Sequence, residues 1–339
     1  MGVRLPAHIA FIALSPILST AFVVLNSFTI AIFVKKFRLA SLSLVVMVNI
    51  CVCDIFVCLF SNNFYLLNLL NPAYSWNTGG LACKLFKTLT MMANLNQIFS
   101  LVFLCVDRMG RFISTSSRQF KKEHGFAFLV ITWVASMILS APRMFLFDEK
   151  IITKFIPETN TSVIVNYACK PIGIEAAGYI ALTVVQFIAG YAIPMVVILY
   201  CLIRCEIFIR RHMLMLSQLN LERASSVAML NQQISQTFNM TGLLFMVIWT
   251  PFFILSILDL HVNLLGRNDL KDINFTLRCT LLVLGSGKPL IYLVSLKKFR
   301  SAFCGYFRKG SSLSSGSSKY SHSSGTAHGK GVSLSTSGM

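Results

Sequence analysis

Residues 83–111 read CKLFKTLTMMANLNQIFSLVFLCVDRMGR, and this stretch decides the fold. A helix rises about 1.5 Å per residue, so the 25 positions from Cys83 to Arg108 would cover roughly 37 Å, one bilayer core with its interfaces. Asn94, Asn96 and Gln97 fall in the middle of the stretch, where polar side chains are costly against lipid. The stretch is therefore predicted to be a transmembrane helix enclosed by other helices.

The composition of the whole chain is that of a membrane protein. Its 339 residues are 55% hydrophobic and 12% charged, whereas a soluble domain carries about 25% charged residues. In a soluble protein the formal net charge of +18 would suggest a nucleic-acid partner. Here the basic residues lie at the ends of apolar stretches, which indicates membrane topology instead. We expect no nucleic-acid partner, no cofactor and no metal.

Seven apolar stretches are each long enough to cross a bilayer, and they lie at residues 8–34, 41–69, 81–112, 124–142, 176–209, 232–261 and 272–294. The predicted fold class is an all-α membrane protein, a seven-transmembrane helix bundle with an amphipathic eighth helix. The predicted organisation is a short extracellular N-terminus at 1–7, the bundle at 8–294, a membrane-surface helix at 295–307 and a disordered Ser/Gly-rich cytoplasmic tail at 308–339.

The distribution of charge predicts the orientation. With the N-terminus outside, the inner segments hold 19 of the 30 Lys and Arg residues and the outer segments hold 10, with one inside the membrane. The outer segments also hold seven of the 12 acidic residues, so the inside is strongly positive. We therefore expect a multi-pass plasma-membrane protein with an extracellular N-terminus.

Three modifications are predicted from this topology. Asn160 begins an Asn-Thr-Ser sequon in an outer loop and is the expected glycosylation site. Cys304 on the surface helix is a candidate for palmitoylation, with an unmodified interfacial cysteine as the alternative. The serines of the tail could be phosphorylated, which would make receptor kinases and arrestin partners through the tail, or the tail is a plain flexible segment.

Several motifs occur along the spans in a fixed order and spacing: Asn26, Asn49, Asp54, Trp76 with Gly79, Asp107-Arg108-Met109, Trp133, Pro194, Phe245 with Trp249-Thr250-Pro251, Pro289-Leu290-Ile291-Tyr292, and Phe299-Arg300. In this order they resemble the rhodopsin-like (class A) G protein-coupled receptors, and the peptide receptors among them, over about residues 8–307. Each motif is weak alone, and the ordered set is specific. The resemblance implies a receptor that binds an extracellular ligand and activates a heterotrimeric G protein.

The resemblance assigns roles to residues. Cys83 and Cys169 are expected to form a disulfide that ties the second outer loop to the third helix, with free thiols as the alternative. The residues expected to serve activation and G protein coupling are Asp54, Asp107, Arg108, Phe245, Trp249, Pro251, Lys288, Pro289 and Tyr292. The alternatives are simple core packing for Trp249 and an interfacial arginine for Arg108, which Asp107 would hold in a resting receptor.

Departures from the family pattern are as informative as the matches. Met109 replaces the usual tyrosine, and Asn231 stands where many relatives have an acid, which predicts a low barrier to activation and measurable basal signalling. Lys288 replaces an asparagine at a position that faces Asp54, across a pocket that holds sodium in many relatives. A lone ammonium in mid-membrane is costly, so we hypothesise that Lys288 pairs with Asp54 and replaces sodium. The alternative is a neutral lysine, or one that reaches water.

The predicted ligand-binding residues are Lys87, Thr90, Met91, Asn94, Gln186, Phe252, Phe253, Ser256, Asp259, Asn274 and Arg278. Thr90 occupies the position where aminergic receptors require aspartate, and Leu282 the position where opsins require lysine, so we expect neither a monoamine nor retinal. Arg278 with Lys87 could take a carboxylate, or Arg278 could pair internally with an acid.

A peptide with mixed charge is the favoured ligand, because the outer loops carry both signs of charge. A lipid or a small carboxylate is the alternative within the receptor class. A proton- or ion-coupled transporter is the alternative of another class, since Asp54 and Lys288 could relay protons. An enzyme is not expected, because the chain carries no HExxH, GxSxG or phosphate-loop motif.

Overall fold

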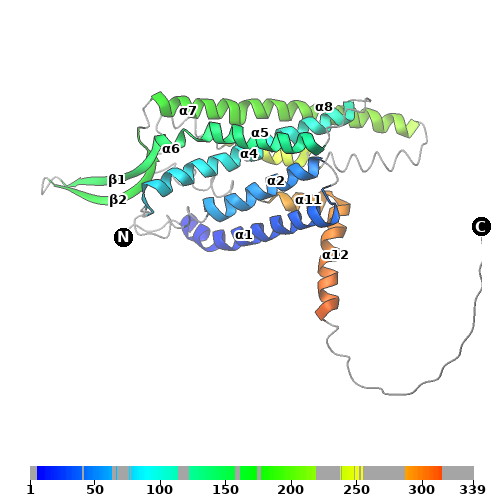
Figure 1. Cartoon of the computed structure of the whole chain (residues 1–339), viewed down its shortest axis with the longest axis horizontal. Coiled ribbons are helices and arrows are strands. Elements are labelled where there is room, and N and C mark those ends of the chain that lie inside the picture. Colours follow the sequence, from blue (N-terminus) through cyan, green and yellow to red (C-terminus); the bar gives the residue numbers. More distant parts are fainter. Residues whose placement is uncertain are drawn as a thin grey trace, which may run out of the picture.

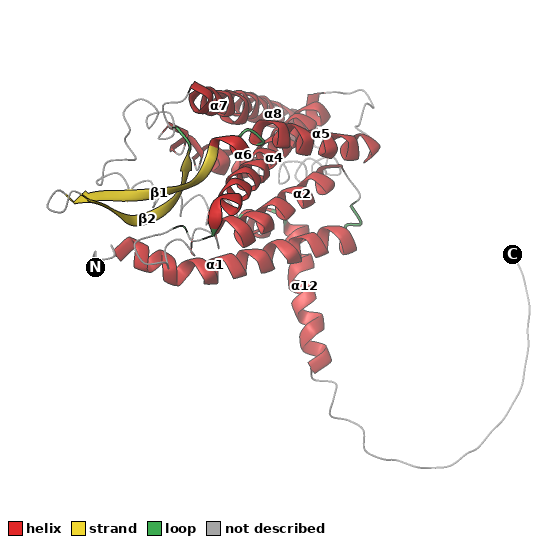
Figure 2. Ribbon diagram, turned by 60° about the vertical axis from the view of Figure 1, so that its left-hand side comes forward, coloured by secondary structure: helices red, strands yellow, loops and turns green. Residues whose placement is uncertain are grey.

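The computed structural model describes residues 6–39, 42–62, 66, 76, 78–113, 122–156, 161–173, 177–218, 237, 239–247, 249–251, 253–254 and 287–314. The long helices lie side by side with their axes roughly parallel (Figure 1). α1 begins at the end of the bundle that carries a two-stranded β-sheet, and the last helix leaves from the opposite end (Figure 2).

Five helices of the described part are long and apolar enough to cross a membrane. They are built from α1 (Pro6–Ala31) with η1 (Ile32–Lys36), α2 (Leu42–Phe56) with η2 (Val57–Asn62), α4 (Gly79–Ile113), α5 (Lys122–Ser140), and α7 (Ala177–Phe187) with η4 (Ile188–Ala192) and α8 (Ile193–Gln218). They coincide with the first five predicted spans. The predicted spans at 232–261 and 272–294 lie mostly outside the described residues, apart from helical positions between 237 and 254 and the start of α11 (Lys288–Ser295).

The π-helical turn η4 ends two residues before Pro194, and the proline provides a local cause for it. Proline has no backbone N–H to donate, and its ring crowds the carbonyl of the residue four positions earlier, here Gly190. Widening the turn before the proline relieves that crowding. As a result Gly190 faces α4 so closely that a Cβ atom on it would lie 2.7 Å from the Cδ2 of Leu95.

The segment between α5 and α7, which is the second outer loop of the predicted orientation, contains a β-hairpin that the sequence analysis did not predict. After the short helix α6 (Arg143–Leu146), β1 (Phe147–Ile156) pairs antiparallel with β2 (Thr161–Pro171), and Glu149 lies opposite Cys169. β2 is rich in β-branched residues at 161–165, which favour strands. Figures 1 and 2 show the hairpin projecting from the end of the bundle where α1 begins.

The end of the bundle opposite the hairpin, named the inner end after the predicted orientation, carries α12 (Lys297–Ser314), which runs across the direction of α1 (Figures 1 and 2). This is the eighth helix, and it ends at Ser314 rather than at the predicted Phe307. Phe299 and Ala302 on one face are buried, whereas Arg300 on another is exposed. The two-faced pattern suits a helix that lies on a membrane surface.

The described core has three clusters of buried residues. One surrounds Trp76, Cys83 and Phe147, and another surrounds Phe33, Tyr292 and Phe299. In the third, apolar residues of α4, α8 and the sixth predicted span meet around Ile98, Leu101, Cys105, Ile198, Cys201, Leu202 and Phe245.

Candidate functional site

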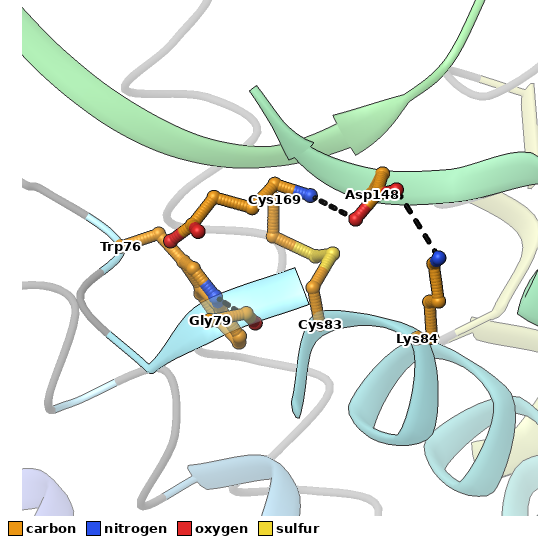
Figure 3. Close-up of a disulfide and its surroundings, with 7 residues drawn as sticks. Trp76, Gly79, Cys83, Lys84, Asp148 and Cys169 are labelled. Atoms are coloured by element: carbon orange, nitrogen blue, oxygen red, sulfur yellow. Dashed lines mark hydrogen bonds and ion pairs between the residues drawn. A yellow bond between two sulfur atoms is a disulfide. The ribbon is translucent and has the colours of Figure 1, made fainter. Parts of the chain in front are cut away.

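A disulfide between Cys83 and Cys169 fixes the outer end of the site (Figure 3), as the resemblance predicted. It joins the first turns of α4 to β2, with the two Cα atoms 5.5 Å apart. Trp76 is 2% exposed beside it. Its backbone N–H donates to the carbonyl of Tyr167 at 2.7 Å, and its indole Nε1 donates to the carbonyl of Gly79 at 3.0 Å. The hairpin is therefore anchored to α4 both covalently and through Trp76.

An ion pair reinforces the same anchor. The Nζ of Lys84 lies 3.1 Å from the Oδ2 of Asp148, between α4 and β1 (Figure 3). The backbone N–H of Glu149 donates to Asp148 at 2.9 Å. That hydrogen bond first, and Lys84 second, hold the pKa of Asp148 below its ordinary value. The sequence analysis missed this pair, because nothing in the residue pattern aligned β1 with α4.

Two cations lie against one aromatic ring below the hairpin. The Nζ of Lys87 is 5.7 Å from the ring centroid of Phe147, and the Cζ of Arg143 is 5.4 Å from the same centroid. Arg143 also donates to the Oε1 of Gln186 at 2.5 Å, and the Nε2 of Gln186 donates to the carbonyl of Leu139 at 2.8 Å. The arrangement holds two positive charges near the outer end of α4 and α7.

Four of the predicted ligand-binding residues share one face of α4. Lys87, Thr90, Met91 and Asn94 have helical spacing of three and four and are all half-buried, which is compatible with a cavity wall. Gln186 is only 2% exposed, and its amide is engaged with Arg143 and Leu139. Phe252, Ser256, Asp259, Asn274 and Arg278, like the sequon residue Asn160, lie outside the described residues.

Aromatic side chains of the fifth and sixth predicted spans meet below these cations. Tyr191 stacks on Phe253 with centroids 4.7 Å apart, and Trp249 lies 5.8 Å from Phe253 and 6.3 Å from Phe245. Tyr191 and Thr250 share a hydrogen bond with 2.7 Å between their hydroxyl oxygens, and the hydroxyl of Thr250 donates to the carbonyl of Met246 at 2.6 Å. This bond joins η4 to the turn before Pro251, and sequence reasoning did not find it.

Asp54 and Lys288 form a buried ion pair in mid-bundle, as the sequence analysis hypothesised. The Lys288 Nζ lies 2.7 Å from the Asp54 Oδ1 and donates to the Gln97 Oε1 at 3.2 Å. The Gln97 Nε2 donates to the same Asp54 oxygen at 2.8 Å. The side chains of Asp54 and Lys288 are 2% and 13% exposed. The three residues connect α2, α4 and α11, and Pro289 follows at the start of α11.

A small cavity adjoins this pair on the side of the sixth predicted span. Its volume is about 30 Å³, enough for a water molecule. Its polar lining comes from Gln97, Thr241 and Lys288, and the rest is apolar, including Phe245 and Trp249. The ion pair and the predicted moving aromatic residues therefore border one space.

A second polar network ties α2, α4 and α5 together. The indole Nε1 of Trp133 donates to the Oδ1 of Asn49 at 3.0 Å, and the Nδ2 of Asn49 donates to Ser100 at 3.0 Å. The motif residues Asn49 and Trp133, predicted only as family markers, are thus direct partners. Each donor and acceptor pair is buried or half-buried between helices, where an unmade bond would be costly.

The inner end presents the remaining predicted activation residues. Asp107 is 2% exposed and accepts a hydrogen bond from the Ser43 hydroxyl at 2.9 Å, so it is linked to α2. Arg108 next to it is half-buried near the end of α4. Tyr292 is buried among Phe33 and Phe299, with centroids 6.1 and 6.2 Å away. Cys304 on α12 is exposed.

Comparison with known proteins identifies the class. Residues 25–292 match the model of the 7 transmembrane receptor (rhodopsin family), which covers most of the chain. The chain therefore belongs to the rhodopsin family of seven-transmembrane, G protein-coupled receptors. The predicted fold is confirmed. The family consists of membrane receptors and not of enzymes in general, and it places the chain as a multi-pass protein of the plasma membrane.

Individual relatives are distant. The chain is 25% identical to Chemerin-like receptor 2 of Rattus norvegicus over 240 residues, which are 68% of this chain and 61% of that protein. It is 26% identical to "Rhodopsin, GQ-coupled" of Mizuhopecten yessoensis over 245 residues, 69% of this chain and 46% of that one. The structure of squid rhodopsin superposes with a TM-score of 0.75 at 16% identity, over 92% of this chain and 89% of the other, which shows the shared fold. The chain thus spans about 61% of the length of the rat receptor that it matches.

Proposed function

We propose that this chain is a receptor that binds an extracellular peptide through a carboxylate and activates a heterotrimeric G protein. The observation that carries the proposal is the pair Lys87 and Arg143, whose cationic groups lie 5.7 and 5.4 Å from the Phe147 ring below the hairpin. An aromatic ring attracts a cation through its face, and ammonium and guanidinium groups are also the donors that bind carboxylates most strongly.

The surrounding charge supports an anionic group on the ligand. Residues 79–92, 143–156 and 161–173, the described segments around the outer end, contain six Lys and Arg residues against two acids, Asp148 and Glu149. Asp148 is paired with Lys84. The excess positive charge would raise the local concentration of a ligand that carries a carboxylate.

A peptide is favoured over a fatty acid because of the hairpin that lies at the proposed entrance to the ligand site. The hairpin is held beside α4 by the disulfide and by Trp76 rather than folded into an apolar portal, and its edge offers backbone groups to an extended chain. Contact with an exposed strand is a mode of recognition that peptides use and fatty acids cannot. The relative from Mizuhopecten yessoensis is named a rhodopsin, but retinal is not proposed as the ligand of this chain, because Leu282 stands where opsins have lysine.

The inner end supports coupling to a G protein. Arg108 lies near the end of α4, and the basic residues Lys35, Lys36 and Arg38 lie at the same end of the bundle, consistent with an inner location and an extracellular N-terminus. Receptor kinases would phosphorylate the serines of the tail, and the phosphorylated tail would recruit arrestin. Glycosylation of Asn160 and palmitoylation of Cys304 complete the proposal.

The test is a G protein activation assay in cells that express the chain at confirmed surface levels. The probes are a peptide library synthesised as matched free acids and C-terminal amides, together with a series of long-chain fatty acids. We expect a free-acid peptide to activate, its amide to be at least about 10-fold weaker because one charge-assisted contact is lost, and Arg108→Ala to silence the response.

Matched variants locate the contact. Arg143→Gln and Lys87→Gln should each reduce potency at least about 10-fold, whereas Lys170→Gln, an exposed lysine on β2, should not. Equal potency of acid and amide forms, or full potency in both outer variants, would contradict the carboxylate contact. Activation by fatty acids alone would contradict the peptide.

A further inference from the structure

The family to which the chain belongs implies a sodium ion beside Asp54, and the residues of this structure do not fit one. Asp54 is 1% exposed, and its Oδ1 lies 2.7 Å from the ammonium nitrogen of Lys288. The ammonium lies at hydrogen-bond distance from one oxygen of the carboxylate that a sodium ion would have to share, and two like charges so close in a buried site repel strongly. Gln97 completes the contacts by bonding both partners of the pair.

We propose that the Lys288 ammonium is a resident cation: it compensates Asp54 permanently, and the chain binds no regulatory sodium there. The proposal does not depend on the ligand class proposed above, because it concerns only this buried pair.

The burial of Asp54 favours a compensating cation beside an ionised carboxylate. A buried ionised carboxylate is costly unless it is paired and hydrogen-bonded. Among the described residues, the Asp54 Oδ2 has no hydrogen-bond partner, and the contacts of Oδ1 are Lys288 and Gln97. Since Gln97 is neutral, Lys288 supplies the compensating positive charge.

The covalent attachment of the Lys288 ammonium to α11 limits how this cation can move when the receptor changes conformation. A free ion can leave when a receptor changes shape, whereas the Lys288 ammonium can move only with its own helix. The cavity of about 30 Å³ next to Lys288, lined also by Gln97 and Thr241, would extend toward Asp54 if the lysine side chain were shortened. Lys288→Asn should therefore convert the site into one that attracts a small cation.

Thermal unfolding of the purified full-length chain tests this without any ligand. The melting temperature is measured by intrinsic tryptophan fluorescence in sodium chloride and in choline chloride at equal concentration. We expect wild type to melt at the same temperature in both salts. Lys288→Asn should melt at least about 2 °C higher in sodium, because an ion that binds only the folded state stabilises it.

Two controls make the result specific to the carboxylate. Asp54→Asn/Lys288→Asn removes the anion and should lose the preference for sodium, and Lys170→Asn, an exposed lysine, should behave as wild type. Lys288→Gln provides a second variant if Lys288→Asn does not fold. A higher melting temperature of wild type in sodium than in choline would overturn the proposal. It would also be overturned if Lys288→Asn and Lys288→Gln both fold and each melts at the same temperature in the two salts.

Discussion

Two sides of the bundle are held together by different interactions. Between α2, α4, α5 and α11, buried polar side chains meet directly: Trp133 with Asn49, and Asp54 with Lys288 and Gln97. Between α4, α8 and the sixth predicted span, the described contacts are chiefly apolar, and the Tyr191 hydroxyl donates a hydrogen bond to Thr250 from the fifth span to the sixth.

This difference between polar and apolar contacts indicates which side of the bundle can change its conformation. Buried hydrogen bonds and ion pairs require one geometry, because a shifted helix leaves polar groups unsatisfied. Apolar side chains can repack at a new register for a smaller cost, and a proline such as Pro251 already weakens its helix. We therefore expect α2, α4, α5 and α11 to form the fixed side and the sixth span to be the element that moves.

The largest expected effect comes from leaving one charge of the central pair alone. Lys288→Met or Asp54→Asn should each destabilise the fold by about 3–5 kcal/mol, because an uncompensated charge stays buried. The double variant Asp54→Asn/Lys288→Met should recover most of that loss. Melting temperatures in choline chloride measure this, and a loss in the double variant equal to the sum of the two single losses would mean that the two residues are not coupled.

A smaller effect is expected at the other network of the fixed side. Trp133→Phe removes the indole donor to Asn49 and should cost about 1–3 kcal/mol, the penalty of an unsatisfied buried acceptor. The melting temperature should fall by several degrees while basal signalling per surface receptor stays unchanged. A rise in basal signalling would show that this side also gates activation.

The smallest effect is expected at the outer ion pair. The pKa of Asp148 lies below its ordinary value of 3.8, so the contribution of its charge is present above that pH and is lost as the pH falls through the lowered value. Asp148→Asn should change the melting temperature little, because the pair is partly exposed to solvent, which screens it. The change should be the same at pH 7 and at pH 5. A difference between those two pH values would mean that another group titrates with it.

The sequence predicted those parts of the fold and of the site that follow from composition and from the energetic cost of a charged group in mid-membrane. Five spans follow from apolar length, and the pairing of Lys288 with Asp54 follows because a lone ammonium cannot stay in mid-membrane. The disulfide followed from the family resemblance, with Cys83 and Cys169 in the same outer region.

The sequence could not predict the contacts that depend on how a helix is rotated about its axis or on which distant elements fold together. Arg143 and Phe147 become neighbours of Lys87 only because α6 and β1 fold back over α4, and no periodic pattern encodes that return. Gln186 was predicted to line the ligand cavity, but the rotation of α7 directs its amide toward Arg143 and Leu139. The hairpin was missed because β-branched residues also suit an apolar helix or a loop.

Basal G protein activation at matched surface expression tests the contrast between the two sides most directly, with Tyr191→Phe compared against Trp133→Phe. Tyr191→Phe keeps the ring that stacks on Phe253 and removes only the hydroxyl bonded to Thr250, the link to the moving span. The account predicts that Tyr191→Phe raises basal signalling about 2- to 10-fold, the effect of one lost hydrogen bond on a two-state equilibrium, and that Trp133→Phe does not. Unchanged signalling in Tyr191→Phe, or an equal rise in both variants, would contradict it.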